Sequence, residues 1–219
     1  MALQLYAHPF SSYCWKVLIA LWEKDLPFTY RHVEHEGVME ELAAIWPLRK
    51  FPVLTDDGRP VIETSVIIEH LDLNHPGPRL IPEDAQAALE VRLMDRMFDL
   101  NVMNAAQNPV NEAIRQMRTG DGRVDIARTE AAAPLDAIYG WLEDRLAGRT
   151  WAAGENFTLA DCAAAPSLFY ADWVHPIDER FATLRAYRAR LLARPTVSRA
   201  VEEARPYRHY FPLGAPDRD

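Results

Sequence analysis

The sequence predicts a two-part protein, a small α/β domain followed by an all-helical domain. Strand-like and helical segments alternate up to about residue 75. Three prolines within residues 75–82 then end any regular element, because proline lacks a backbone N–H and cannot continue a helix or a central strand. Beyond residue 84 the apolar residues recur only at helical spacing. We therefore predict domains at residues 1–75 and 85–219, joined by a linker at residues 76–84.

The first element is the apolar run from Leu3 to Ala7, which has the length and content of a short buried strand. A proline and two serines interrupt it, and apolar residues at helical spacing follow up to about Lys24. A helix that starts at Ser11 or Ser12 leaves free N–H groups beside the positive end of the helix dipole, and these favour an anion such as a thiolate. Alternatively, the serine only caps the helix.

The rest of the first domain completes a small mixed sheet. Residues 27–33 are aromatic and β-branched, which favours a second strand, and residues 39–45 have a short helical pattern. Residues 49–55 and 60–63 are two apolar runs joined by Asp57-Gly58, a strong hairpin signal. Residues 64–73 then show a helical apolar stripe. The predicted order is strand, helix, strand, helix, hairpin, helix.

The second domain shows only helical signals. One long helix is expected from residue 85 to 118, with a kink at Pro109, where a backbone hydrogen bond is lost. Gly120 and Gly122 indicate a turn. Helices are expected at residues 126–146, 159–173, 184–192 and 197–204. The pair Thr158 and Asp161 has the spacing of a capping box, which we interpret as folding information rather than chemistry.

Composition excludes several classes of protein. The 219 residues carry a net charge of −8 without a Lys/Arg block, which argues against nucleic acid and anionic membranes as partners. No apolar run is long enough for a membrane span, and the N-terminus lacks the pattern of a signal peptide. Only Cys14 and Cys162 occur, so no disulfide framework is visible. We expect a cytoplasmic protein.

Three motifs in the first domain carry a family resemblance. They are the segment from Ser11 to Leu21, the segment Phe51-Pro52-Val53-Leu54, and Glu63-Thr64-Ser65 followed by residues 67–71. With the all-helical half behind them, they resemble the cytosolic glutathione transferase superfamily over nearly the whole chain. The first motif is most similar to the Ser-type zeta and theta classes. The resemblance implies a thioredoxin-like N-terminal domain, an all-α C-terminal domain and glutathione as cosubstrate.

The resemblance assigns catalytic roles to Ser11 or, if the turn is shifted by one residue, Ser12. The serine hydroxyl would donate a hydrogen bond to the glutathione sulfur and favour the thiolate over the thiol. Cys14 takes the second position of a thioredoxin-like motif, where a small buried core residue is the simpler interpretation. Tyr13 stands where zeta relatives have a cysteine, which weakens the match to maleylacetoacetate isomerases.

Glutathione would bind through the other two motifs. A cis bond at Phe51-Pro52 would turn the Phe51 backbone groups toward a peptide-like ligand, whereas an ordinary trans proline at a strand edge is the alternative. Glu63 suits the α-ammonium and Thr64 the α-carboxylate, although Thr64 could be only a helix cap. Lys50 could meet the glycyl carboxylate or be a solvated surface charge.

The electrophile would lie between the domains. By the family layout, its site would include Phe10, Tyr13, Asn101, Met103 and Asn104, although the last three could equally be helix surface and core. We expect no metal: the run from His32 to Glu36 has two histidines and two glutamates, but it reads as a polar loop without the i, i+4 spacing of a zinc helix.

The sequence thus predicts a glutathione transferase that attacks a small hydrophobic electrophile. Other reactions of the same thiol remain open: maleylacetoacetate-type isomerisation, reductive dehalogenation and disulfide reduction. A non-catalytic glutathione-transferase-like binding module is the alternative outside enzymes. The apolar content of residues 85–105 exceeds what one buried helix face requires, so we also predict a homodimer.

Overall fold

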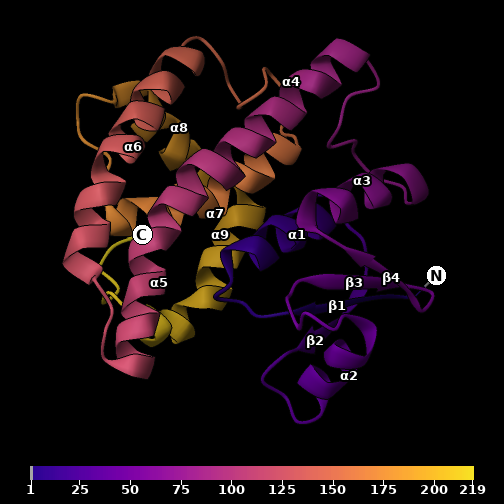
Figure 1. Ribbon diagram of the computed structural model, residues 1–219. Helices are drawn as coiled ribbons and strands as arrows, with labels where there is room; N and C mark the ends of the chain where they lie inside the picture. The colour runs from indigo at the N-terminus through magenta and orange to yellow at the C-terminus, as the bar shows by residue number, and fades with distance from the viewer. Residues whose placement is uncertain (1) are drawn as a thin grey trace.

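The computed structural model describes residues 2–219 and contains an α/β half and a helical half that pack side by side (Figure 1). The α/β half consists of β1 (Leu3–Ala7), α1 (Ser12–Glu23), β2 (Phe28–His32), α2 (Val38–Ile45), β3 (Val53–Asp56), β4 (Arg59–Ile62) and α3 (Thr64–Asn74). The helical half consists of α4 (Ala85–Arg96), η1 (Met97–Met103), α5 (Asn104–Thr119), α6 (Val124–Arg145), α7 (Leu159–Val174), α8 (Ala182–Leu192), α9 (Pro195–Ala204) and η2 (Arg205–Tyr210). Within the described residues, no helix is both long and apolar enough to cross a membrane.

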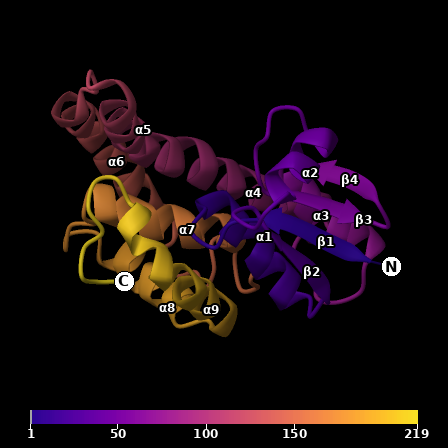
Figure 2. The ribbon, with the colours of Figure 1, turned by 90° about the horizontal axis from the view of Figure 1, so that it is seen from below.

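The four strands form one sheet in the order β2-β1-β3-β4. β1 pairs with β2 in parallel and with β3 antiparallel, and β3 pairs with β4 in the predicted hairpin. This mixed sheet with α1 and α3 on one face and α2 on the other is the thioredoxin-like arrangement. In Figure 1, α1 and α3 lie above the sheet and α2 lies below it, and Figure 2 is the view from below. The order of elements predicted for this half is therefore confirmed.

Alternation along β1 decides what each face of the sheet packs against. Leu5 and Ala7 pack against α1 and α3, whereas Tyr6 packs against α2. Successive side chains of a strand point to opposite faces, so a single strand supplies both cores. The last residues of β1 lead directly into the turn that carries Ser11, which places that turn at the edge of the sheet nearest the helical half.

The segment between α3 and α4 is fixed by one buried carboxylate. Asp72 accepts hydrogen bonds from the backbone N–H groups of Leu80 and Ile81, at 2.9 Å and 2.7 Å from Oδ2, and pairs with Lys24 at 2.9 Å. Gly77, at a φ of 106°, passes so close to Lys24 that a Cβ would lie 2.7 Å from the Lys24 carbonyl oxygen. A side chain at position 77 would therefore collide with the backbone of α1.

A single hydrophobic core fills the helical half and extends into α1. Almost all of α7 is buried at its centre, and Trp15 and Ile19 of α1 belong to the same cluster. The predicted capping box at the start of α7 is present, and Asp161 also accepts from the backbone of Ala152 and the hydroxyl of Tyr187. The two halves therefore share packing, which holds the cleft between them in a fixed shape.

The long helix predicted for residues 85–118 is interrupted, but ahead of the predicted position. Residues Met97–Met103 form a π-helical segment, η1, while α5 continues through Pro109. The wider i→i+5 turn changes which residues face the α/β half. Neither proline nor glycine occurs in that segment, so no conventional helix-breaking signal predicts it. The short helix η2, which directly follows α9, was also not predicted from the sequence.

Candidate active site

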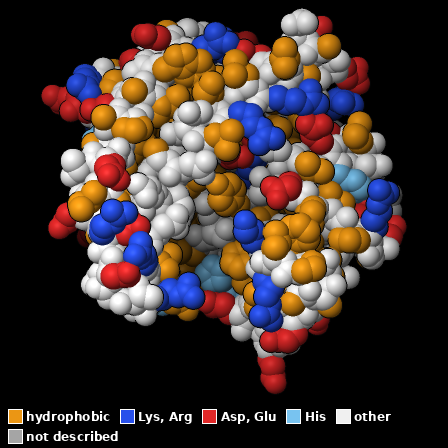
Figure 3. Space-filling model, in the orientation of Figure 1, with side chains coloured by type: hydrophobic (Ala, Val, Ile, Leu, Met, Phe, Trp, Pro, Cys, Tyr) orange, Lys and Arg blue, Asp and Glu red, His pale blue; other side chains and the backbone are white. Residues whose placement is uncertain are grey.

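Two cavities meet where the α/β half faces the helical half. Figure 3 shows that the surface is hollowed between the two halves. The first, here called the polar cavity, has a volume of about 380 Å³ and is lined by Tyr13, Trp46, Lys50, Phe51, Pro52, Ile62, Glu63, Thr64, Ser65, Val66, Arg96, Asp99 and Leu100. The second, the apolar cavity, has a volume of about 420 Å³ and is lined by His8, Phe10, Ser11, Ser12, Tyr13, Phe51, Met103, Ala106, Gln107, Val110, Ile114, Tyr170, Val174, Tyr210, Phe211 and Pro212. Tyr13 and Phe51 line both, so the cavities adjoin at these two side chains.

Both candidate catalytic serines line the apolar cavity. Ser11 is the N-cap of α1, and its Oγ accepts a hydrogen bond from the Cys14 N–H at 3.4 Å. A hydroxyl that accepts in this way still has its own proton to donate. Ser12 is the first residue of the helix, ahead of the first helical bond, which runs from the Trp15 N–H to the Ser11 carbonyl. Both serines are half-buried and open to a ligand.

The turn that presents Ser11 is braced by His8. Its Nδ1 accepts from the Phe10 N–H at 3.0 Å, and its carbonyl oxygen accepts from the Ser11 N–H at 3.1 Å. The His8 N–H in turn donates to Sγ of Cys14 at 3.5 Å. Burial raises the pKa of the Cys14 thiol to about 12, against smaller lowering effects of those hydrogen bonds. Cys14 is thus a protonated core side chain in this structure and not a reactive thiolate.

The polar cavity gathers all five residues predicted to bind glutathione: Lys50, Phe51, Pro52, Glu63 and Thr64. The Phe51-Pro52 peptide bond is cis, as the family resemblance implied, and the alternative of an ordinary trans proline is excluded. Lys50 is exposed at the mouth of the cavity. Their roles toward glutathione stay predictions, but the fold brings three separate sequence motifs to one cavity.

Glu63 has an unusual backbone conformation. Its φ is 69°, in the left-handed region that glycine favours and glutamate rarely adopts. Glu63 is also the N-cap of α3, although its side chain caps nothing, and Thr64 is the first helical residue rather than the cap. A strained, exposed carboxylate beside a helix N-terminus is typical of a functional position rather than a structural one.

Three of the five residues predicted for the electrophile site line the apolar cavity: Phe10, Tyr13 and Met103. Asn101 and Asn104 do not line either cavity and are exposed to solvent. Neighbouring residues of a helix point in different directions, so Asn101, Met103 and Asn104 could not all face one cleft. From Met103 onward the lining residues of α5 follow spacings of three and four, which the sequence could have indicated.

The far wall of the apolar cavity was not predicted from the sequence. It is formed by Tyr170 and Val174 of α7 and by Tyr210, Phe211 and Pro212 near the C-terminus. The hydroxyl of Tyr170 donates to the Phe10 carbonyl at 2.8 Å, which joins α7 to the serine turn. These residues lie more than 150 positions from Ser11, and no motif in the sequence linked them.

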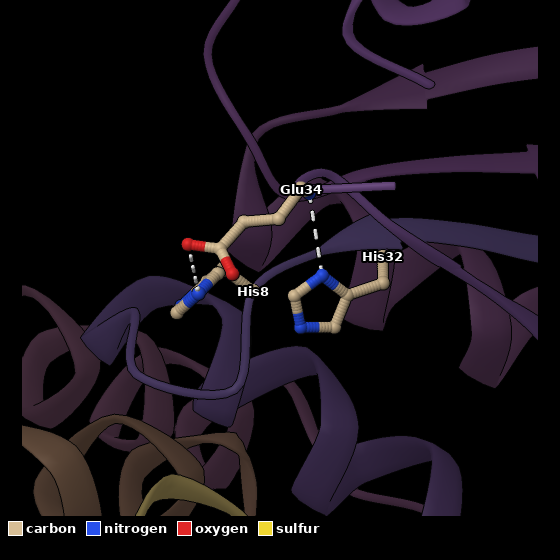
Figure 4. A group of neighbouring side chains, drawn as sticks. All are labelled: His8, His32 and Glu34. Atoms are coloured by element: carbon tan, nitrogen blue, oxygen red, sulfur yellow. Dashed lines mark hydrogen bonds and ion pairs between the residues drawn. The ribbon is translucent and has the colours of Figure 1, made fainter. Parts of the chain in front are cut away.

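A histidine–glutamate group borders the apolar cavity (Figure 4). His8 and Glu34 point toward one another, with Nε2 and Oε1 3.2 Å apart, and Nδ1 of His32 accepts from the Glu34 N–H at 3.3 Å. Both imidazoles use Nδ1 as an acceptor, so in their neutral forms each has its proton on Nε2. Neither Nε2 then offers a lone pair to a metal, and the arrangement does not fit a metal centre.

Comparison with known proteins agrees with this geometry. Residues 5–79 match the model of the glutathione S-transferase N-terminal domain, and residues 125–190 match that of the C-terminal domain. A probable maleylacetoacetate isomerase of Vibrio cholerae is 28% identical to this chain, and the match covers 94% of this chain and 98% of the relative. FtsZ-localized protein A of Caulobacter vibrioides is 27% identical over 82% of each chain.

Solved structures lead to the same family. A glutathione S-transferase from Methylobacillus flagellatus, crystallised with glutathione bound, superposes with a TM-score of 0.78 and 26% identity over 91% of this chain and 98% of its own. The fold and the two adjoining cavities define a protein with a thioredoxin-like domain and a helical domain around one cleft. The chain belongs to the glutathione S-transferase family.

Proposed function

We propose that the protein is a glutathione transferase that binds glutathione in the polar cavity and activates its thiol for attack on an electrophile in the apolar cavity. The observation that carries the proposal is the meeting of the two cavities at Tyr13 and Phe51, beside the N-cap serine of α1. A tripeptide in the polar cavity, paired with the Phe51 backbone as an added strand would be, would direct its cysteine toward this junction.

Ser11 is the group that we assign to thiol activation. Its hydroxyl donates to the sulfur while its oxygen keeps the bond from the Cys14 N–H. The start of α1 adds the positive end of a helix dipole. A free thiol with a pKa near ~8.5 is only a few per cent ionised at pH 7. Lowering that pKa by about two units requires roughly 2.7 kcal/mol and makes most of the bound thiol reactive. Ser12 remains the alternative donor.

The electrophile that fits the apolar cavity is small and uncharged. Aromatic and aliphatic side chains dominate the lining, and within residues 2–219 no Lys, Arg, Asp or Glu contributes to it. Maleylacetoacetate carries two carboxylates, for which this lining offers no cation. The charge of the lining therefore favours transfer to an apolar electrophile over the isomerisation named for the Vibrio cholerae relative.

The test is direct. Purified protein is titrated with glutathione while thiolate absorbance is recorded, and turnover is then measured against a panel of electrophiles, maleylacetoacetate and mixed disulfides. We expect glutathione to bind as a thiolate at pH 7 and an uncharged electrophile to be consumed. Absence of glutathione binding would overturn the proposal.

A second candidate is a binding module without catalysis. It is favoured by the similarity to FtsZ-localized protein A, a relative named for a location rather than a reaction. The same experiment separates the candidates, since a module of this kind would bind glutathione or nothing and turn over none of the electrophiles. Ser11, the cis peptide at Pro52 and the strained Glu63 favour the enzyme, because a scaffold requires none of them.

We also propose that the protein is a cytoplasmic homodimer. In each chain, residues 76–84 are the linker between the two domains. Leu89, Leu93 and Leu100 are exposed along α4 and η1, and Val66 and Leu73 are exposed on neighbouring α3. Covering these side chains would remove a sizeable apolar surface from water. Light scattering should give about twice the chain mass of 25.0 kDa, and a single species of chain mass at micromolar concentration would contradict the dimer.

A further inference from the structure

The serine turn, residues 8–11, is held by three hydrogen bonds of His8. The backbone N–H of His8 donates to Sγ of Cys14, and its carbonyl accepts from the Ser11 N–H at 3.1 Å. The third bond uses the side chain, because Nδ1 accepts from the Phe10 N–H at 3.0 Å. Asparagine makes the same bond to the N–H two residues on, with an oxygen as the acceptor. An imidazole nitrogen, in contrast, accepts only while it is unprotonated.

The other bonds of the serine turn do not titrate near neutral pH. The indole N–H of Trp15 donates to the Pro9 carbonyl at 2.5 Å. The Tyr170 hydroxyl donates to the Phe10 carbonyl at 2.8 Å, and burial raises the pKa of that phenol well above its ordinary value. Every backbone polar group of the turn has a partner. Nδ1 of His8 is therefore the partner that a proton can remove in weak acid.

The surroundings of the His8 ring keep it neutral at pH 7. The residue is 8% exposed, and burial lowers the pKa of His8 below its ordinary 6.5. The carboxylate of Glu34, with Oε1 3.2 Å from Nε2, opposes this effect only in part (Figure 4). Glu34 is 42% exposed, so solvent weakens its attraction for a proton on the ring. The other titratable groups around the ring are Cys14, bonded to the His8 N–H, and the rings of Tyr207, His32 and Tyr210, with centroids at 4.7, 5.0 and 6.0 Å.

We propose that His8 is a positioning residue for thiol activation, and that it holds Ser11 in place only while its imidazole is neutral. This inference rests on the proposed function and adds a residue that acts on the glutathione sulfur through Ser11. A proton on Nδ1 sets two N–H groups against each other, so the bond to Phe10 is lost. Phe10 precedes Ser11 and both line the apolar cavity, so the serine hydroxyl then loses its fixed direction toward the sulfur. Acid thus weakens activation at the turn in addition to protonating the thiol.

A direct electrostatic role of His8 would have the opposite sign. An imidazolium beside the sulfur would favour the thiolate, because opposite charges attract. The positioning role predicts instead that a proton on His8 and a thiolate on glutathione disfavour each other. Such coupling is reciprocal, so glutathione bound as a thiolate should lower the pKa of His8. The direction of that change separates the two roles.

The first experiment measures the ratio of thiolate to thiol in bound glutathione, from its ultraviolet absorbance at saturating glutathione. His8→Ala lacks the acceptor at every pH, so the ratio at pH 7 should fall by about threefold to tenfold, the effect of one hydrogen bond. His8→Asn offers an oxygen to the same N–H and should recover most of that loss. Between pH 7.5 and pH 5 the ratio in the wild type should fall about threefold to tenfold more than in His8→Asn, which does not titrate.

His32 provides the matched control. Its Nδ1 also accepts from an N–H two residues on, that of Glu34 at 3.3 Å, and its ring lies beside His8. It lines neither cavity and makes no bond to the serine turn. His32→Asn should therefore keep the steep decline of the wild type in acid. Circular dichroism over the same pH range tests folding, and should His8→Ala fail to fold, the wild type and His8→Asn still give the comparison of slopes.

Nuclear magnetic resonance provides the second measurement. The His8 ring and the Phe10 N–H are followed through a pH titration with and without glutathione. The Phe10 resonance should move with the protonation of His8, and the pKa of His8 should be lower with glutathione bound. A higher pKa with glutathione, or thiolate ratios that decline in parallel in the wild type and His8→Asn, would overturn the positioning role while glutathione binding persists. A wild-type protein that binds no glutathione would overturn the proposed function and this role together.

Discussion

The polar and apolar cavities adjoin, yet they are built in opposite ways. The polar cavity takes most of its lining from short contiguous segments around Phe51-Pro52 and Glu63-Thr64, and it contains four charged side chains, Lys50, Glu63, Arg96 and Asp99. The apolar cavity is assembled from the turn after β1, from α1, η1, α5 and α7, and from the C-terminal segment, without a Lys, Arg, Asp or Glu among the described lining residues. A site that must recognise a constant zwitterionic peptide needs fixed charges at fixed spacings, whereas a site for apolar groups needs only shape and burial.

The two cavities also differ in what determines their shape. Backbone conformation, with a cis peptide and a glutamate at positive φ, shapes the polar cavity. Packing between distant helices shapes the apolar one, for example the bond from Tyr170 to the Phe10 carbonyl. Substitutions in the polar cavity should therefore change glutathione binding, and those in the apolar cavity should change use of the electrophile.

The largest effect is expected at the junction of the cavities. If Ser11 polarises the sulfur, Ser11→Ala should lower turnover at pH 7 by about 25-fold, the ratio of thiolate fractions for pKa values near 6.5 and 8.5. The defect should shrink as pH rises past the pKa of the free thiol, because solvent then makes the thiolate unaided. A pH series of turnover, with thiolate absorbance of bound glutathione, measures both effects.

Ser12→Ala and Cys14→Ala are the controls for that series. Ser12→Ala should change little, and Cys14→Ala should act only through packing, since this thiol is buried and protonated. Unchanged thiolate absorbance in Ser11→Ala would reject the assignment. Loss of the thiolate in Ser12→Ala alone would leave the mechanism unchanged but identify Ser12, and not Ser11, as the donor to the glutathione sulfur. A collapse confined to Cys14→Ala would instead indicate disulfide exchange by an enzyme thiol.

The second effect concerns the polar cavity alone. Glu63→Gln keeps the size and hydrogen bonding of the side chain but removes the charge opposite the α-ammonium, so glutathione affinity should fall by about tenfold. Turnover at saturating glutathione should remain close to that of the wild type. Calorimetry gives the affinity, and steady-state kinetics give the turnover. An unchanged affinity would mean that Glu63 is structural and that glutathione binds elsewhere.

A smaller effect is expected in the apolar cavity. Ile114 lines its rim and is 39% exposed, so Ile114→Ala should lower kcat/KM for an apolar electrophile by about threefold to tenfold, as expected for one or two methylene groups of contact. Glutathione affinity should not change. Met117→Ala is the matched control, because Met117 is on the same helix and 76% exposed but lines neither cavity. Equal effects of the two variants on kcat/KM would mean that Ile114 does not contact the electrophile.

The smallest expected effect is on the pH dependence of folding stability, to which His8 at the apolar cavity and Asp99 at the polar cavity contribute differently. Burial, partly opposed by Glu34, lowers the pKa of His8 from its ordinary 6.5, so the unfolded chain takes up this proton first and stability is lost as pH falls below 6.5. Burial raises the pKa of Asp99 despite Lys16, so its contribution to stability grows as pH falls through that raised value. As pH falls, the titration of His8 therefore lowers the stability of the folded protein, whereas the titration of Asp99 raises it.

Denaturant unfolding between pH 7 and pH 4 separates these contributions. His8→Asn keeps an acceptor for the Phe10 N–H but does not titrate, so it should lose less stability between pH 7 and pH 5 than the wild type. Asp99→Asn should lack the stabilisation that appears at lower pH. Parallel pH profiles for the wild type and both variants would show that neither group has a shifted pKa in the folded protein.

The sequence by itself determined the elements and the parts of the site that are local. Periodicity, the Asp57-Gly58 turn and the prolines after residue 75 were enough for the order of strands and helices, because each depends on nearby residues. The same holds for a serine at the start of α1 and for the capping box at Thr158. The cis bond before Pro52 was expected only from the family resemblance, because tertiary context decides between cis and trans at an X-Pro bond. Such features are decided by backbone geometry over a few positions.

Only the tertiary structure decided which distant side chains share a cavity. Asp99 of the π-helical segment Met97–Met103 lines the polar cavity while Asn101 and Asn104 are exposed to solvent, although no proline or glycine marks that segment. Tyr170 and Phe211 joined the apolar cavity through the packing of α7 and the C-terminal segment against α1. These placements depend on the angle and phase at which helices meet, which are set by the whole core and not by any short stretch of sequence.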